Sequence, residues 1–398
     1  MKRLAVGVLA LGLGLGLGQS QAPLKIGVVV SATGPGASLG IPERNTLLLL
    51  EEQTNKRGGV GGRPVQFVIV DDASDTTQAV RAARKLIQED QVLAIIGTTT
   101  TPATLAMIDP IAEGGVPNLS LAANREIVAP IDDKRKWIFK TPQTEEQMSQ
   151  PIVQDMTANN VKSVAYIGFN DAYGEGWAKA FEAAAKEAGI NVVASERFSR
   201  SDTSVTGQIL RILSKNPDAV LIGGSGTAPV LPQRTLKERG YKGLIYQTHG
   251  VANPDFLRVG GDAVIGTRLP AGPILVFDQL PANFPTKKVG QSYVQQYEAK
   301  YGIGSYSTFG GHAYDAWTIL RAALERTLKS AQPTDLAAFR TALRNEIEAT
   351  KGVVGTHGIF NMSAQDHLGL KFNEAAVMVE VVKNPSGKLG WKLVRTFQ

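Results

Sequence analysis

The side chains that could carry catalytic or metal chemistry do not fall into the spacings that such chemistry needs. The four histidines, His249, His312, His357 and His367, form no HxxxH or HxH pair, so the helix-borne spacing of a zinc site is missing. The chain has no cysteine, which excludes a zinc–thiolate site and a cysteine nucleophile. We therefore expect neither a bound metal nor a cofactor.

The glycine-rich stretch Gly223-Gly224-Ser225-Gly226 is a candidate enzyme motif because it follows a strand-like segment. A nucleophile elbow needs a glycine two residues after its serine, and Thr227 stands there instead. A dinucleotide fingerprint needs a third glycine, which is missing. No Gly-Lys-Ser or Gly-Lys-Thr triplet occurs to end a phosphate loop. These mismatches predict a protein that is not an enzyme.

Asp71 and Asp72, together with Asp75, could hold a cation. They stand at the end of a strand-like segment, directly before a helical pattern that starts near Thr76. Because aspartate is among the preferred residues at helix N-termini, capping of this helix is the favoured interpretation.

The charge of the chain is mildly basic and evenly spread. Lys and Arg number 42 against 36 Asp and Glu, a net charge of +6. Proteins that bind nucleic acid usually carry a basic stripe interleaved with aromatic residues, and this sequence has none. We expect no nucleic-acid partner.

The N-terminus has the layout of a secretory signal peptide over residues 1–22. Lys2 and Arg3 precede an uncharged apolar run over residues 4–18, and small and polar residues follow. The run is shorter than the roughly 20 residues that span a bilayer, and it is rich in glycine. Cleavage after Ser20 and cleavage after Ala22 both fit. Without a cysteine for lipid attachment, the mature protein is expected to be soluble in the periplasm.

Strand-like and helical patterns alternate in two successive series. The first has strands at 24–30, 65–70 and 92–96 and helices at 43–56, 76–89 and 102–113. The second runs from 145 to 248 in the same way, and the stretch 267–285, rich in proline and glycine, is expected to cross between lobes. Three helices follow at 287–300, 309–328 and 335–349, then strands at 375–382 and 391–394. The pattern predicts an α/β protein with two similar lobes, each a parallel-type sheet flanked by helices.

Polar loops follow the strands of both series. In parallel α/β sheets, ligands bind outside the carboxyl ends of the strands, and a cleft between two lobes is a preferred place for them. The tract Thr98–Thr101, which includes Thr99, precedes a helix, where hydroxyls beside free N–H groups make a cradle for a carboxylate. Helix capping would need only one of these four threonines. The other loops lie at 31–36, 119–124, 168–174, 223–227 and 248–250.

From residue 24 to its end, the chain resembles the periplasmic leucine/isoleucine/valine-binding proteins, the type I solute receptors of ABC transporters. Each landmark is weak by itself, but their order and spacing together are specific. They are Leu24-Lys25-Ile26-Gly27, Thr33-Gly34-Pro35, Asn55-Lys56-Arg57-Gly58-Gly59-Val60, Asp71-Asp72-Ala73-Ser74-Asp75, Asp171-Ala172-Tyr173-Gly174 and His249-Gly250-Val251-Ala252-Asn253.

The resemblance implies a set of ligand contacts. A hydroxyl that holds the ligand carboxylate falls on Thr101, and a second contact loop falls on Ala122 and Asn124. Tyr173 would close over the ligand from the other lobe. An aromatic residue of the side-chain pocket corresponds to Phe309.

Three positions depart from the pattern of the amino-acid-binding members. The glutamate that pairs with the ligand ammonium is replaced by His249, and two flanking tyrosines are replaced by Leu39 and Ser225. The family's cysteine pair falls on Ser74 and Thr100, so its disulfide is absent. A neutral histidine holds a buried ammonium less well than a carboxylate does. The ligand is therefore expected to be either an ammonium-free aromatic or branched acid, or a branched-chain amino acid whose ammonium meets another acidic residue.

The resemblance implies a clamp that captures a small carboxylate and delivers it to the membrane permease of an ABC transporter, as a monomer. We expect three hinge crossings, a first lobe of residues 23–141 plus 273–357, and a second lobe of residues 142–272 plus 358–398. The alternatives are a clamp that reports its ligand to a signalling receptor and, with less support, an enzyme of the cleft.

Overall fold

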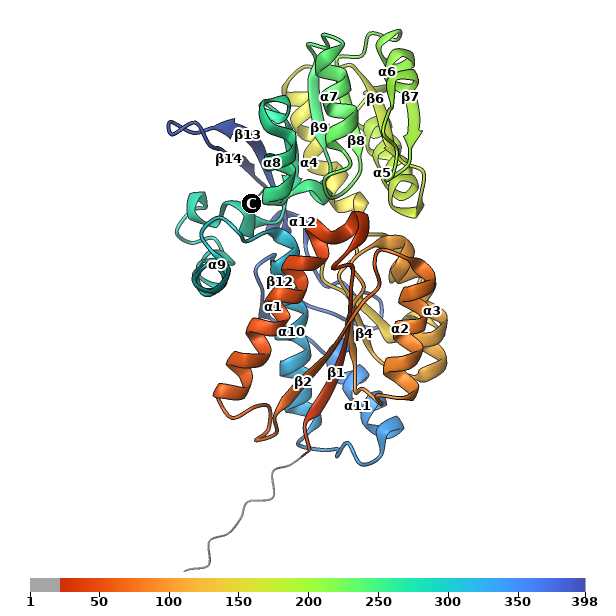
Figure 1. The fold of residues 1–398 in the computed structure, drawn as a ribbon, viewed down its shortest axis with the longest axis vertical. Helices are drawn as coiled ribbons and strands as arrows, with labels where there is room; N and C mark the ends of the chain where they lie inside the picture. The colour runs from red at the N-terminus through yellow and green to blue at the C-terminus, as the bar shows by residue number, and fades with distance from the viewer. Residues whose placement is uncertain (1–21, 398) are drawn as a thin grey trace, which may run out of the picture.

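A computed structural model describes residues 22–397 of the chain. The predicted signal peptide, apart from Ala22, lies outside the described residues. Figure 1 shows two lobes stacked along the long axis of the molecule. The prediction of an α/β protein with two similar lobes is confirmed.

The sheet of the first lobe is entirely parallel. Strand β1 lies inside this sheet and is an almost unbroken apolar run, as expected for a strand that packs against helices on both faces. Its predicted bounds agree with the structure. The strand order is β2 (Val65–Asp71), β1 (Leu24–Val30), β3 (Ile95–Gly97), β4 (Asn118–Ser120) and β5 (Ile138–Lys140).

Helices cover both faces of this sheet. Alternate residues of β1 point to opposite sides, so Ile26 and Val28 join one core and Val29 joins another. The first core includes residues of α1 (Ala37–Lys56), α10 (Thr308–Thr327) and α11 (Leu336–Glu348), and the second includes those of α2 (Thr76–Gln88) and α3 (Thr101–Gly114). In Figure 1, α1 and α10 lie on one side of the strands, and α2 and α3 lie on the other.

The sheet of the second lobe is mixed. Its strands β6 to β10 are parallel, whereas β13 pairs antiparallel with β10, and β14 pairs antiparallel with β13. The order is β14 (Leu389–Thr396), β13 (Val377–Lys383), β10 (Arg268–Ala271), β9 (Leu244–Gln247), β8 (Ala219–Gly223), β6 (Ser163–Phe169) and β7 (Asn191–Phe198). The helices of this lobe are α4 (Glu145–Ala158), α5 (Ala172–Glu187), α6 (Thr206–Leu213), α7 (Val230–Glu238) and α8 (Pro254–Gly260).

Two predicted elements need correction. The helix expected from residue 43 begins at Ala37, with Pro42 inside it, because Gly40 lets the helix pack closely against the chain at Ser31. A Cβ on Gly40 would lie 2.2 Å from the Ser31 carbonyl oxygen. The crossover expected from residue 267 begins later, because Arg268–Ala271 forms strand β10.

The described packing bears on the lobe bounds, which remain a proposal. Between β10 and helix α9 (Lys287–Tyr301), Ile274 packs with residues of α1 and α9, while Leu275 packs with the second sheet. This favours a crossing in that segment, as expected. Phe360 and Ala375 pack in the core of the first lobe, and Ala376 packs in the second. The third crossing is therefore better placed at residues 375–376 than at 357–358.

None of the helices in the described part of the chain is long and apolar enough to cross a membrane.

Candidate ligand-binding site

A small cavity lies between the two lobes. Its free space is about 20 Å³, roughly the room that one buried water needs, so the lobes lie close together around it. Every side chain of its described lining is apolar, a hydroxyl, an imidazole or a guanidinium. The first lobe contributes Leu39, Thr99, Thr100, Thr101, Leu121, Ala123, Phe309 and His312, the second contributes Tyr173, Arg200, Ser225, His249 and Gly250, and Pro142 lies at the expected first crossing.

The threonine tract divides into two pairs with different surroundings. The hydroxyls of Thr98 and Thr99 turn inward and bond to the buried carboxylates of Asp72 and Glu43, the latter at 2.5 Å. Thr100 is the N-cap residue of α3 but makes no side-chain cap, and the Thr101 hydroxyl is buried without a hydrogen-bond partner. At the positive end of a 14-residue helix, an unpaired hydroxyl is suited to a carboxylate oxygen.

A buried polar network holds this tract in place. The Ser31 amide donates to the Thr99 hydroxyl at 2.9 Å, and the Ser31 hydroxyl donates to Asp72 at 2.7 Å. Burial raises the pKa of Glu43 well above its ordinary value. Asp75 caps α2 by accepting from the Gln78 amide, as predicted. The acidic residues near Thr76 therefore serve to build the loop and the helix.

Arg200 is the cationic side chain of the cavity lining. Its Nε donates to Asp171 at 2.7 Å and its Nη1 donates to the Ser225 hydroxyl at 3.1 Å. The guanidinium carbon lies 4.1 Å from the centre of the Phe169 ring. These contacts fix the planar donor group, which is well suited to binding a carboxylate.

Asp171 has its own structural task at the same place. Its Oδ1 accepts from the Tyr173 and Gly174 amides at the start of α5, at 2.9 and 3.3 Å. Both of its oxygens are therefore engaged, one by the helix and one by Arg200. Asp171 positions the arginine and the helix that carries Tyr173.

Tyr173 and Gly250 fit closely together in the second lobe. The Tyr173 hydroxyl lies 2.9 Å from the hydroxyl of Thr248. A Cβ on Gly250 would lie 2.4 Å from the tyrosine oxygen and 2.7 Å from the Ser225 Cβ. A side chain at position 250 would therefore displace two residues of the cavity wall.

His249 is buried and uncharged. Its Nδ1 is enclosed without a hydrogen-bond partner, and its ring lies 5.6 Å from that of Trp177. Burial, with smaller contributions from Lys140 and His357, lowers its pKa to about 3. At neutral pH this side chain offers the ligand a neutral imidazole.

Acid should destabilise the folded protein through His249. Its folded pKa of about 3 lies below the ordinary value of 6.5, so between these values the unfolded chain binds a proton that the folded chain does not. The stability is fully present above pH 6.5 and should fall by about 1.4 kcal/mol per pH unit below it. The free energy of unfolding, measured with urea at several pH values from neutral to pH 4.5, should fall less steeply with pH in His249→Gln than in the wild type. An equal pH dependence in the two proteins would contradict the assignment.

The structure brings seven of the predicted site residues into one lining and leaves two outside it. Inside are Leu39, Thr99, Thr101, Tyr173, Ser225, His249 and Phe309, although the Thr99 hydroxyl is engaged with Glu43. Outside are Ala122, whose amide donates to Ser120 at 3.1 Å, and Asn124, whose Nδ2 donates to the Ala172 carbonyl of the other lobe at 3.1 Å. Their neighbours Leu121 and Ala123 line the cavity in their place.

The loop of Ala122 and Asn124 is held by a buried lysine. Lys140 Nζ donates to the carbonyl of Ala123 and lies 3.4 Å from that of Asn124. Burial lowers the pKa of Lys140 to about 8. These bonds fix the loop of Ala122 and Asn124, and the Asn124 side chain of this loop reaches the second lobe.

Two polar lining residues, Arg200 and His312, were missed in the sequence. Arg200 follows strand β7, so the rule that ligands bind beyond strand ends could have found it. His312 lies three residues after Phe309 on α10, and residues so spaced share a helix face. Neither belongs to a motif that marks it by itself.

Comparisons with known proteins agree with this architecture. The profile of a family described as periplasmic binding protein matches residues 23–385. The Leu/Ile/Val-binding protein BraC3 of Rhizobium johnstonii is 28% identical over 340 residues, 84% of this chain and 87% of that protein.

Solved structures extend the likeness. An extracellular ligand-binding receptor from Rhodopseudomonas palustris HaA2 is 39% identical, with a TM-score of 0.87 over 94% of this chain and 100% of that one. A solute-binding protein of an ABC transporter from Rhodopseudomonas palustris BisB5, in complex with 3,4-dihydroxybenzoic acid, is 22% identical, with a TM-score of 0.76 over 94% and 96%. The chain belongs to the periplasmic binding protein family.

Proposed function

We propose that this protein is the exported solute-binding component of an ABC transporter of the branched-chain amino acid type, and that its ligand is a small carboxylate without an α-ammonium group. The observation that carries the ligand class is the lining itself, which offers hydroxyls, neutral imidazoles and one guanidinium. An ammonium ion buried among these groups would lack a counter-charge, which is costly.

Two carboxylates bond to side chains of the lining. Glu43 accepts from Thr99 with one oxygen, and Asp171 accepts from Arg200 and the start of α5. Because no carboxylate belongs to the described lining, the alternative that another carboxylate replaces the family's glutamate has less support. The ligand carboxylate fits at Thr101, and Leu39 and Phe309 provide an apolar wall for its hydrocarbon part. On closure, the same carboxylate would also meet Arg200 and Ser225 of the second lobe.

The mechanism is lobe closure without bond making or breaking. Asn124 bonds across to Ala172, and the backbone at Gly226 approaches Leu39 so closely that a Cβ there would lie 3.2 Å from its Cδ1. The lobes therefore already meet at the rim of the cavity. Closure around a ligand excludes water and strengthens the polar contacts, and the permease would recognise the closed form. The predicted leader supports a periplasmic location, and a monomer fits this role.

The relatives support the transport role more than the ligand. The Rhizobium johnstonii relative is named for leucine, isoleucine and valine, which keeps a branched-chain amino acid as the rival ligand. The neighbour with bound 3,4-dihydroxybenzoic acid is only 22% identical, so it indicates the fold alone. The ligand class therefore depends on the cavity of this chain.

Matched ligand pairs test the proposal. The chain without residues 1–22 is unfolded, refolded and melted with leucine or 4-methyl-2-oxopentanoate, and with phenylalanine or 3-phenylpropanoate. Within each pair the main difference is the ammonium group. We expect at least one of the two acids to raise the melting temperature by about 3 °C at a hundredfold excess over its Kd, and the amino acids to leave it unchanged.

Two controls complete this experiment. Stabilisation by leucine or phenylalanine without stabilisation by the matched acid would overturn the ligand class and retain the transport role. Mass spectrometry of the acid after prolonged incubation should recover it unaltered, and a product would favour the enzyme alternative.

A further inference from the structure

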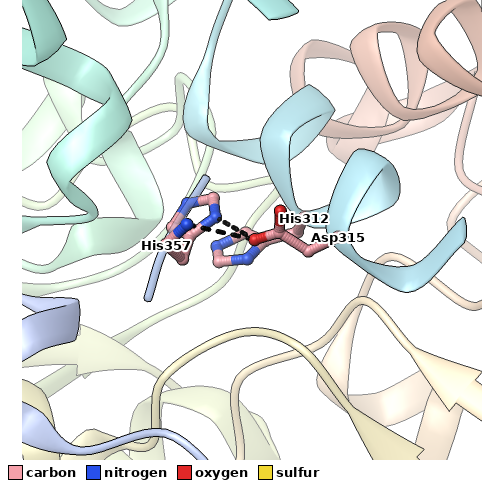
Figure 2. A group of neighbouring side chains, drawn as sticks. All are labelled: His312, Asp315 and His357. Carbon is pink, nitrogen blue, oxygen red and sulfur yellow. Dashed lines mark hydrogen bonds and ion pairs between the residues drawn. The ribbon is translucent and has the colours of Figure 1, made fainter. Parts of the chain in front are cut away.

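A buried cluster of two histidines and one aspartate borders the ligand cavity (Figure 2). His312 and Asp315 come from helix α10, and His357 comes from the loop between strands β11 (Val353–Val354) and β12 (Ile359–Phe360). His312 also lines the cavity, whereas Asp315 and His357 are fully enclosed. One residue of the cluster therefore faces the ligand cavity, and the other two support it from the protein interior.

Asp315 fastens the loop of His357 to α10. Its Oδ1 accepts from the Thr356 amide at 2.6 Å, and its Oδ2 accepts from the His357 amide at 3.1 Å. His357 Nδ1 lies 2.9 Å from the same Oδ2, so it carries the proton and donates to the carboxylate. The tautomer and the orientation of the His357 ring are fixed by these bonds.

His357 in turn holds the ring of His312. The two rings are stacked, with centroids 3.6 Å apart and planes 14° apart. Behind His357 stands Gly272, where a Cβ would lie 2.1 Å from the His357 Cδ2, and the Thr141 hydroxyl donates to the His312 carbonyl at 3.1 Å. The His312 ring therefore has little freedom to turn.

The surroundings of His312 indicate which nitrogen carries its proton. Nδ1 is buried without a hydrogen-bond partner, and a bare N–H is costlier to enclose than a lone pair that meets no donor. Burial lowers the pKa of His312 well below its ordinary value, so the ring carries one proton. That proton belongs on Nε2, the nitrogen left to reach the cavity.

The same three residues could be taken for a metal site, because their donor atoms lie within 4.8 Å of one another. A metal ion binds an imidazole close to the plane of its ring, at about 2.0–2.1 Å for zinc. One ion cannot lie in the planes of two stacked, nearly parallel rings. The arrangement therefore suits a hydrogen-bonding role for His312 better than metal binding.

We propose that His312 is a ligand-contact residue that donates a hydrogen bond from Nε2 to an oxygen of the bound acid, and that Asp315 and His357 are positioning residues for its ring. This inference rests on the proposed function for the chemical class of the ligand. It adds a donor from the first lobe, on the face of α10 that also carries Phe309.

Matched variants test the role of the donor. His312→Phe keeps a flat ring for stacking but removes the N–H, whereas His312→Gln keeps an N–H near the position of Nε2. We expect the Kd for 3-phenylpropanoate or 4-methyl-2-oxopentanoate, measured by calorimetry, to rise about 10- to 100-fold in His312→Phe and less than about fivefold in His312→Gln. His357→Phe, which keeps the stack and loses the bond to Asp315, should fall between them.

His367→Phe is the control for damage to a buried histidine. His367 stacks on Phe139 at 4.2 Å and bonds to the Ile138 carbonyl, outside the cavity lining. Its replacement should lower the melting temperature while the Kd stays within about twofold. A Kd for His312→Phe that is no higher than that of His367→Phe would overturn the proposal.

A second readout needs no ligand. Nitrogen-15 NMR of the free protein should show His312 as the Nε2–H tautomer, and the Nδ1–H tautomer or a cationic ring would overturn the assignment. Stoichiometric stabilisation by Zn²⁺ that is lost in His312→Phe would overturn it in favour of a metal site. If the wild type binds only leucine, the proposed ligand class fails, and the same variants with leucine as the probe still decide the role of His312.

Discussion

Replacing Arg200 by methionine is expected to weaken binding of 3-phenylpropanoate or 4-methyl-2-oxopentanoate about 100-fold. The methionine keeps much of the apolar stem that lies over Phe169 but removes the fixed donor group. It also leaves Asp171 without its cationic partner in a partly buried place. The pair that matters for affinity is the guanidinium and the ligand carboxylate. Truncating one member of a buried, hydrogen-bonded charge pair across a binding interface typically costs 2–5 kcal/mol in binding. Titration calorimetry of the refolded protein measures the change.

Two variants show whether the guanidinium itself is responsible. Arg200→Lys keeps the charge but not the planar fork, so we expect a loss of about tenfold. Arg258→Met removes an exposed Arg–Asp pair from the same lobe, outside the cavity lining, and should leave the Kd within about twofold. If Arg200→Met binds the ligand with the affinity of the wild type, the ligand carboxylate does not contact the Arg200 guanidinium.

The fold could be predicted where one stretch of sequence contains the whole physical reason. Strand β1 packs against helices on both faces, so its apolar run marks both ends of the strand. The cap of α2 needs only Asp75 and the amide of Gln78 three residues later. Both are local facts, and both predictions agree with the structure.

Other features depend on contacts between distant residues. Helix α1 continues through Pro42, and Gly40 at its start packs against the Ser31 carbonyl, which no local pattern reveals. Phe360, Leu370 and Ala375 pack in the first lobe because partners from β1 and α10 lie there, whereas Phe372 packs against the core of the second lobe. Their sequence has no clear periodicity, so the place of the third crossing depends on this long-range packing and stays a proposal.

The candidate site shows the same division. The rule that ligands bind beyond the ends of parallel strands was enough to find the loops of Thr101, Tyr173 and Ser225. The family resemblance then singled out these three residues, all of which line the cavity. The sequence could not distinguish Ala122 from Leu121, because the backbone conformation of the loop decides which of the two side chains faces the cavity. The role of Arg200 could not be predicted in this way, because its guanidinium is oriented by Asp171 and Ser225, which lie 29 and 25 residues away in the sequence.

Replacing His249 by glutamate is expected to exchange the ligand class. A carboxylate at this buried position would repel a bound acid and would supply the counter-charge that an amino acid needs. Like charges placed together in an interface cost several kcal/mol, so the Kd for 3-phenylpropanoate should rise at least about 100-fold. Leucine or phenylalanine should begin to stabilise the protein in the thermal-shift assay, from no effect in the wild type.

His249→Gln separates the effect of charge from the loss of the imidazole. Glutamine has nearly the shape of glutamate and stays neutral, so this variant should retain the acid within about tenfold and should gain no affinity for leucine. The contrast between the two variants then isolates one negative charge beside Trp177, within the influence of Lys140. If both variants bind the acid equally, the ligand carboxylate lies far from position 249, and the histidine would not explain why this cavity excludes an ammonium group.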